Sequence, residues 1–183
     1  MTTALLVIDF QQALVNTEPL PGDAAMVSAN INALMQRARQ AGAPVVLIQH
    51  EDDSELVHGT EAWALSTQLN IEPRDHVVAK RTPDSFLNTH LGALLAAHAV
   101  THVVICGYAS EFCVDTTTRR AAANGLTVTL AADAHTTHDK PHASAAAIRA
   151  HHNATLSNIS SFGPKISARP ASEIAFDTPA RGG

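Results

Sequence analysis

Short, uninterrupted apolar runs recur along this chain, separated by segments with helical periodicity. A run of this kind is typical of a strand buried on both faces, because helices cover both sides of a parallel sheet. The runs span residues 4–8, 44–49, 76–79, 102–106 and 127–131. A sixth strand is expected near residues 154–159. The alternation predicts an α/β fold with a mainly parallel sheet and helices on both faces.

The helical segments carry signals of their own. Apolar residues spaced by three or four positions indicate one face of a helix within residues 27–38. Residues 113–124 are expected to form a helix that Gly125 stops, and residues 142–153 one that their alanine content favours. In a fold of this class we expect a ligand to bind beyond the carboxyl ends of the strands.

Composition limits the classes of partner. The chain has 183 residues, of which 45% are hydrophobic, which is enough for one domain over residues 1–183. The formal net charge of −5 argues against nucleic acid, and no apolar run approaches the roughly 20 residues that span a membrane. The opening "MTTALLVIDFQQ" lacks the pattern of a signal peptide, so we expect a cytoplasmic protein with two reduced cysteines. Residues 170–183 are expected to form a mobile tail or an arm that packs on a neighbouring copy.

Three reactive side chains follow three of the predicted strands. Asp9 and Lys80 each come directly after an apolar run, and Cys113 follows another after the loop "GYASEF". Each has an ordinary reading, since aspartate forms turns, lysine is usually solvated and a lone cysteine is often a small core residue. The carboxyl ends of parallel strands meet at one edge, however, so an acid, a base and a thiol are expected to converge there.

The sequence around these residues resembles the isochorismatase-like cysteine hydrolases, a superfamily that includes nicotinamidases and N-carbamoylsarcosine amidase. The resemblance covers residues 4 to about 160 and rests on "LLVIDFQQ", "VVAKRTPDSF" and "VVICGYASEFCVDTTTRRAAANGLTVTLAADAHTT". It implies a Rossmann-like three-layer α/β/α sandwich with six strands, and a catalytic triad of Asp9, Lys80 and Cys113. It also implies a cis peptide bond between Tyr108 and Ala109, an oxyanion hole formed by the backbone N–H groups of Ala109 and Cys113, and a homo-oligomer, either a dimer or a tetramer.

The implied reaction is hydrolysis of a C–N bond in a small amide, ureide or carbamoyl compound through a thioester on Cys113. We expect a helix start and the ammonium of Lys80 to lower the pKa of the Cys113 thiol. Asp9 would take the thiol proton and pass it to the leaving amine. Gln11 is two residues past Asp9 and would point the same way on an extended backbone. The residues expected to line the substrate pocket are Phe10, Gln11, Trp63, Tyr108 and Phe112.

Two other functions stay open at this stage. One is hydrolysis of a vinyl ether of the isochorismatase type, against which Cys113 argues, because that branch of the superfamily usually lacks the cysteine. The other is a metal-binding member without amidase activity. The eleven histidines and the stretch "HEDD" at 50–53 suggest this function. The order of these residues fits no compact zinc motif, so we expect no metal and no cofactor.

Overall fold

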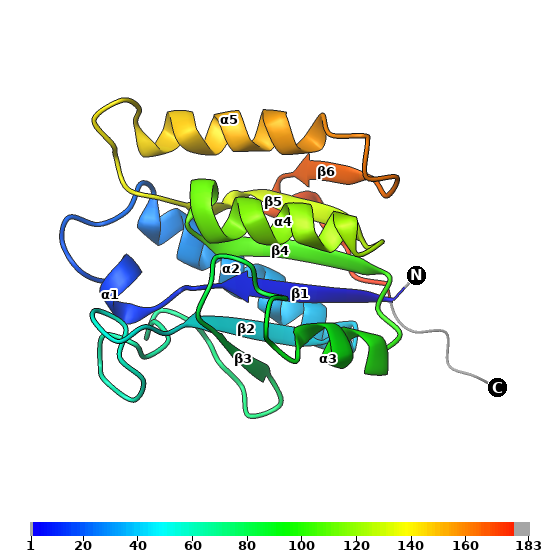
Figure 1. Cartoon of the computed structure of the whole chain (residues 1–183), viewed down its shortest axis with the longest axis horizontal. Helices are drawn as coiled ribbons and strands as arrows, with labels where there is room; N and C mark the ends of the chain where they lie inside the picture. The colour runs from blue at the N-terminus through cyan, green and yellow to red at the C-terminus, as the bar shows by residue number, and fades with distance from the viewer. Residues whose placement is uncertain (1, 178–183) are drawn as a thin grey trace.

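The apolar runs pair side by side into one sheet in the computed structural model, which describes residues 2–177 (Figure 1). All six strands are parallel, in the order β3-β2-β1-β4-β5-β6. Their bounds are β1 Thr3–Ile8, β2 Val45–His50, β3 His76–Lys80, β4 His102–Tyr108, β5 Thr127–Thr136 and β6 Ile166–Arg169. The predicted α/β fold with a six-stranded sheet is confirmed, and every strand pair is parallel.

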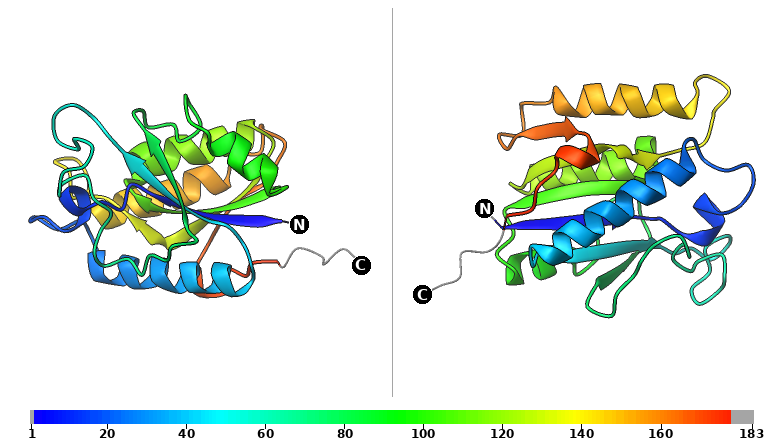
Figure 2. Two further views of the ribbon diagram at one scale, coloured as in Figure 1. Left: turned by 90° about the horizontal axis from the view of Figure 1, so that it is seen from below. Right: turned by 180° about the vertical axis from the view of Figure 1, so that it is seen from behind.

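Helices cover both faces of the sheet (Figure 2). The side chains of β1 alternate between two cores. Leu5 and Val7 belong to a core with α2, while Leu6 and Ile8 belong to a core on the opposite face with α3, α4 and α5. The helical elements are α1 Gln12–Val15, α2 Ala24–Gln40, α3 Leu91–Ala97, the π-helical turn η1 Ser110–Val114, α4 Asp115–Ala123, α5 Ala145–Ser157 and the 3-10 turn η2 Ala171–Glu173.

The prediction of a strand at residues 154–159 is wrong. Residues 154–157 continue α5, which buries Leu156 in the core, and the sixth strand is β6, Ile166–Arg169. This edge strand has four residues and only Ile166 is buried, so it lacks the apolar run that marks the other strands.

Part of the segment expected to form a mobile tail or an arm on a neighbouring copy packs against its own chain. Ala171 and Ile174 are buried in the core beside α2. The Ala171 N–H donates to Asp133 at 2.6 Å, and the Ala171 carbonyl accepts from Arg37. Residues 178–183, the rest of the predicted tail, lie outside the described residues.

The strand order places the expected ligand position near the middle of the sheet's carboxyl edge. The chain builds β1, β2 and β3 outward on one side, then crosses to β4 on the other side of β1. Sheets of this order bind ligands at the carboxyl ends of the two strands that flank the crossing, here β1 and β4. Within residues 2–177, no helix has the length and apolar character that crossing a membrane requires.

Candidate active site

Residues at or just after the ends of β1, β3 and β4 lie together at the carboxyl edge of the sheet. Asp9 follows β1 with a φ of 45°, and its N–H donates to the Ile48 carbonyl at 3.0 Å. Lys80 is the last residue of β3, and Cys113 lies in η1 directly after β4. A left-handed residue breaks the extended backbone, so it turns the chain away from the strand direction at this point.

The ammonium of Lys80 lies between the carboxylate and the thiol. Its Nζ is 2.8 Å from Asp9 Oδ2 and 3.4 Å from Cys113 Sγ, and it also donates to the Thr82 carbonyl at 3.0 Å. The Lys80 side chain is fully buried and that of Asp9 nearly so. A buried ammonium is stable only when paired, so this contact fixes the relative positions of all three groups.

The expected lowering of the pKa of Cys113 is wrong. Burial, followed by the negative charge of Asp9, raises the pKa of the Cys113 thiol to about 12, and the opposing effect of Lys80 is smaller. The resting site therefore holds a neutral thiol beside a carboxylate. Asp9 Oδ1 is buried and has no hydrogen-bond partner among residues 2–177, which leaves one carboxylate oxygen able to accept a proton.

The turn after β4 shapes the backbone around Cys113. Gly107 has a φ of 115°, and a Cβ there would lie 2.1 Å from the Ile8 carbonyl oxygen, so only glycine fits beside β1. The bond between Tyr108 and Ala109 is cis. The Ala109 carbonyl accepts from the N–H groups of Phe112 and Val114, both at 3.1 Å, while the Ala109 N–H has no acceptor among the hydrogen bonds of residues 2–177.

A buried polar chain holds η1 against β5 and α5. Ser110 Oγ is 2.8 Å from His135 Nδ1, and His135 Nε2 is 2.9 Å from Asn153 Oδ1. Both Ser110 and His135 are fully buried, and burial lowers the pKa of His135 to about 4. His135 is therefore neutral, and its hydrogen bond with Ser110 fixes the turn that carries Cys113.

A pocket of about 230 Å³ opens onto this group. Most of its wall is apolar, and Phe112 at the rim is exposed, with the Lys140 ammonium 5.6 Å from the centre of its ring. Tyr108 and Phe112, both predicted to contact substrate, line it, and the Tyr108 hydroxyl is 2.8 Å from His138 Nδ1. The lining residues are Asp9, Leu14, His50, Leu56, Pro83, Tyr108, Ala109, Phe112 and Cys113.

The other three residues predicted to contact substrate lie elsewhere. Phe10 is fully buried in the core beside α2, because the left-handed turn at Asp9 directs it inward. Gln11 is also buried, and its amide exchanges two hydrogen bonds with the backbone of His50 and donates to the Trp63 carbonyl. Trp63 is outside the pocket wall, and its ring packs 4.4 Å from that of His58.

His50 is a pocket residue that the sequence reasoning considered only as a metal ligand. It is the last residue of β2, and its Nδ1 lies 3.1 Å from Lys80 Nζ. Burial, and next the charge of Lys80, lower the pKa of His50. The sequence held a signal for His50, which directly follows the apolar run at residues 44–49, and the structure pairs it with Lys80 across β2 and β3.

The same residues raise the question of a metal ion. Asp9, His50 and Cys113 form the one group within residues 2–177 whose ligand atoms lie close enough together, within 4.8 Å, to share an ion. Lys80 Nζ, however, is within 3.4 Å of an atom of each of the three. The lysine ammonium thus occupies the position that a cation would take, so the donor set does not fit a metal ion while Lys80 is in place.

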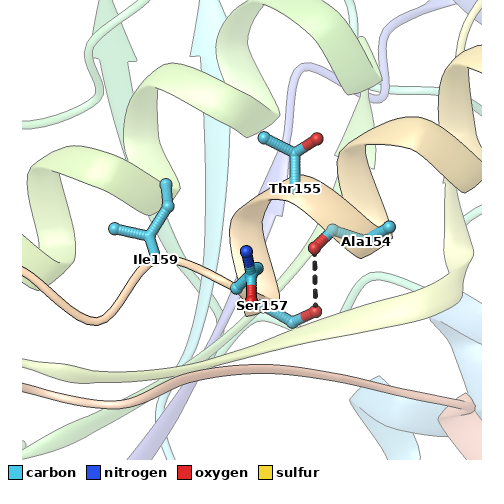
Figure 3. Close-up of a pocket in the computed structure, with 5 residues that line it drawn as sticks. Ala154, Thr155, Ser157 and Ile159 are labelled. Atoms are coloured by element: carbon cyan, nitrogen blue, oxygen red, sulfur yellow. Dashed lines mark hydrogen bonds between the residues drawn. The ribbon is translucent and has the colours of Figure 1, made fainter.

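A larger hollow, of about 650 Å³, lies at the end of α5 (Figure 3). Helices in this fold run back from the carboxyl edge of the sheet, so this hollow is at the opposite edge from Cys113. The Ser157 hydroxyl is bonded to the helix's own carbonyls, as the dashed line to Ala154 shows. The wall of this hollow carries no ionisable side chain and offers no reactive group. It consists of Ala154, Thr155, Ser157, Asn158 and Ile159.

Known proteins share both the sequence pattern and the fold. A streptothricin hydrolase of Streptomyces noursei is 43% identical over 140 residues, which is 75% of this chain and 51% of that protein. The ureidoacrylate amidohydrolase RutB of Pantoea ananatis is 28% identical over 155 residues, covering 64% of this chain and 62% of the relative. The chain spans about half the length of the streptothricin hydrolases that it matches.

Solved structures and a family model agree. A crystal structure described as an isochorismatase family protein superposes with a TM-score of 0.84 at 33% identity, over 91% of this chain and 97% of the other. The model of the isochorismatase domain matches residues 3–161, a span that contains Asp9, Lys80 and Cys113. The chain therefore belongs to the isochorismatase family.

Proposed function

We propose that this protein is a cysteine hydrolase that cleaves a C–N bond of a small amide, ureide or carbamoyl compound through a thioester on Cys113. The observation that carries the proposal is the position of Lys80 Nζ, 2.8 Å from Asp9 Oδ2 and 3.4 Å from Cys113 Sγ, two groups that line a small pocket. The names of the streptothricin hydrolase and the ureidoacrylate amidohydrolase support amide or ureide hydrolysis in general. The homo-oligomer implied by the resemblance stays a prediction.

The first half of the reaction forms the thioester. The Cys113 thiol gives its proton to Asp9, and the sulfur attacks the substrate's carbonyl carbon while the Lys80 ammonium balances the negative charge. The oxygen of the tetrahedral intermediate takes up negative charge, for which the N–H groups of Ala109 and Cys113 are the proposed donors. When the C–N bond breaks, the proton on Asp9 passes to the leaving nitrogen.

The second half releases the acid. Asp9, again a carboxylate, removes a proton from a water molecule as its oxygen attacks the thioester carbon. The C–S bond breaks, the acid departs, and the proton on Asp9 returns to the Cys113 sulfur. Asp9 therefore serves as base and acid in turn, which requires a carboxylate oxygen that Lys80 does not occupy, and Oδ1 meets this requirement.

A pair of cysteine variants tests the proposal, because the chain has only two cysteines. Purified protein is assayed for ammonia or amine release from a panel of small amides, ureides and N-carbamoyl amines, with streptothricin included because of the relative's name. Cys113→Ala is expected to lower the rate by roughly a thousandfold or more, as loss of a nucleophile does. Cys106→Ala is the matched control, because Cys106 is buried in the core beside α2. The rate of this variant should stay near that of the wild type.

Two results would contradict the proposal. One is full activity in Cys113→Ala. The other is consumption of isochorismate without ammonia or amine release from any member of the panel, which would favour vinyl-ether hydrolysis instead. Mass spectrometry of protein quenched during turnover should find the acyl group on the peptide that contains Cys113 and not on the one that contains Cys106.

A further inference from the structure

His50 is held rigidly at the pocket wall. Gln11 Oε1 accepts from the His50 N–H at 2.8 Å, and Gln11 Nε2 donates to the His50 carbonyl at 2.9 Å. The Gln11 amide also donates to the Trp63 carbonyl at 2.7 Å, so it is itself fixed. The backbone of His50 is thus clamped at both its polar groups, and its ring faces the pocket that Cys113 shares.

The contact with Lys80 determines which ring nitrogen carries the hydrogen. An ammonium only donates, and the three hydrogens of Lys80 are shared among four neighbours. A hydrogen on His50 Nδ1 would point at this positive charge 3.1 Å away, so Nδ1 carries the lone pair. A neutral imidazole with a lone pair on Nδ1 carries its hydrogen on Nε2. The ring cannot take a second proton without losing this contact and placing two cations side by side.

The remaining nitrogen of His50 has no hydrogen-bond partner in the described part of the chain. Among the hydrogen bonds of residues 2–177, Nε2 of His50 is not used. The other polar side chains of the pocket wall are engaged, since Asp9 and Cys113 contact Lys80 and the Tyr108 hydroxyl is bonded to His138. The rest of the wall is apolar, so apart from the Cys113 thiol, whose proton the proposed mechanism passes to Asp9, the Nε2–H of His50 is the uncommitted side-chain donor among the described wall residues.

We propose that His50 is a specificity-determining residue, whose Nε2–H donates to a second, uncharged carbonyl oxygen of the substrate, apart from the carbonyl that Cys113 attacks. This inference rests on the proposed function and narrows its substrate class. It favours acylureas, diamides and related compounds with two carbonyls over simple monoamides. It disfavours a carboxylate at that position, because a ring held neutral supplies no charge to pair with it.

The kinetic test compares two compounds of similar length, acetylurea with its two carbonyls and butyramide with one. His50→Asn keeps an acceptor for Lys80 at the position of Nδ1 but does not reach the position of Nε2. We expect it to lower kcat/KM for acetylurea by about tenfold, the value of one buried hydrogen bond, mainly through KM, and to change that for butyramide by less than about twofold. His50→Gln, whose amide nitrogen reaches further, should recover part of the loss.

A matched control is His58→Asn, since the His58 side chain is 69% exposed and lies outside the pocket wall. Its kinetics with both compounds should match wild type. Equal losses for acetylurea and butyramide in His50→Asn would overturn the inference, because His50 would then act only by positioning Lys80.

A second readout does not depend on turnover. In histidine-labelled protein, nitrogen NMR should find the His50 hydrogen on Nε2 at neutral pH, and a hydrogen on Nδ1 or a charged ring would overturn the inference. Acetylurea added to the Cys113→Ala variant should shift the Nε2 resonance, and butyramide should not; no shift with acetylurea also overturns it. If the shift occurs while the wild-type enzyme releases no ammonia from any amide, only the proposed catalytic function fails.

Discussion

The buried imidazole of His135 gives the protein a pH dependence of stability that can be calculated. The unfolded side chain has a pKa of 6.5, while burial lowers the folded value to about 4. As the pH falls through 6.5, the unfolded chain takes up a proton that the folded protein does not, so unfolding becomes more favourable. The full pKa difference of 2.5 (6.5 minus 4) corresponds to about 3.5 kcal/mol of stability at roughly 1.4 kcal/mol per pKa unit.

The effect of His135 on stability can be measured at pH values above the range in which carboxylates titrate. Between about pH 7.5 and pH 5, the His135 contribution should lower the free energy of unfolding by about 2 kcal/mol, because most unfolded molecules but few folded ones are protonated at the lower value. Glutamine at position 135 has no such titration. His135→Gln loses the contacts with Ser110 and Asn153, which costs stability equally at both pH values.

The assay is urea unfolding of wild type and His135→Gln, followed by circular dichroism at both pH values. The stability gap between the two proteins should narrow by about 2 kcal/mol at the lower pH. His50 and His102, whose pKa values are also lowered, are present in both proteins and cancel in this comparison. A gap that stays constant with pH would refute the claim that His135 is held neutral by burial.

Two further substitutions test other parts of the site. Lys80→Met leaves the buried Asp9 carboxylate unpaired, so thermal and urea unfolding should register a loss of roughly 3–5 kcal/mol, much of which the double variant Asp9→Asn/Lys80→Met restores. A double variant no more stable than the single one would contradict this. Gly107→Ala puts a Cβ 2.1 Å from the Ile8 carbonyl oxygen, and we expect a loss of roughly 3 kcal/mol by urea unfolding. Gly125→Ala, also at positive φ but with open space around it, should lose only about 1 kcal/mol, and equal losses would mean that the contact with Ile8 is not the cause.

The fold was readable from the sequence where burial on both faces left a continuous apolar run. Each such run lies in or overlaps a strand, as residues 4–8 do in β1. The run at residues 127–131 marks only the first half of β5, which continues to Thr136. The sixth strand was predicted in the wrong place because β6 is a short edge strand with one buried residue and has no continuous apolar run. Residues 154–157, where a strand was expected, continue the helix that begins at Ala145, and Leu156 packs in the buried face of this helix.

The sequence predicted which residues of the candidate site follow strands, but it did not predict which atoms these residues contact. Asp9, Lys80 and Cys113 meet because three parallel strands end at one edge, and a linear sequence reveals where strands end. Gln11 was placed in the pocket by assuming an extended chain after Asp9. The left-handed φ of 45° at Asp9 ends the alternation of side chains along the strand, and Gln11 instead bonds to the backbone of His50. The apolar run before Asp9 gives no sign of this turn.

The raised pKa of Cys113 is compatible with a nucleophilic role because of where its proton goes. Loss of that proton to bulk water would leave a thiolate that is buried and also close to the negative charge of Asp9. Burial first, and the charge of Asp9 second, raise the pKa of the Cys113 thiol to about 12. Transfer of the proton to Asp9 leaves the total charge of Asp9, Lys80 and Cys113 unchanged. The negative charge only moves from a carboxylate 2.8 Å from the Lys80 ammonium to a sulfur 3.4 Å from it. In the proposed mechanism the site therefore needs no free thiolate at rest, and the lysine that holds the place of a metal ion stabilises the charge at both ends of the transfer.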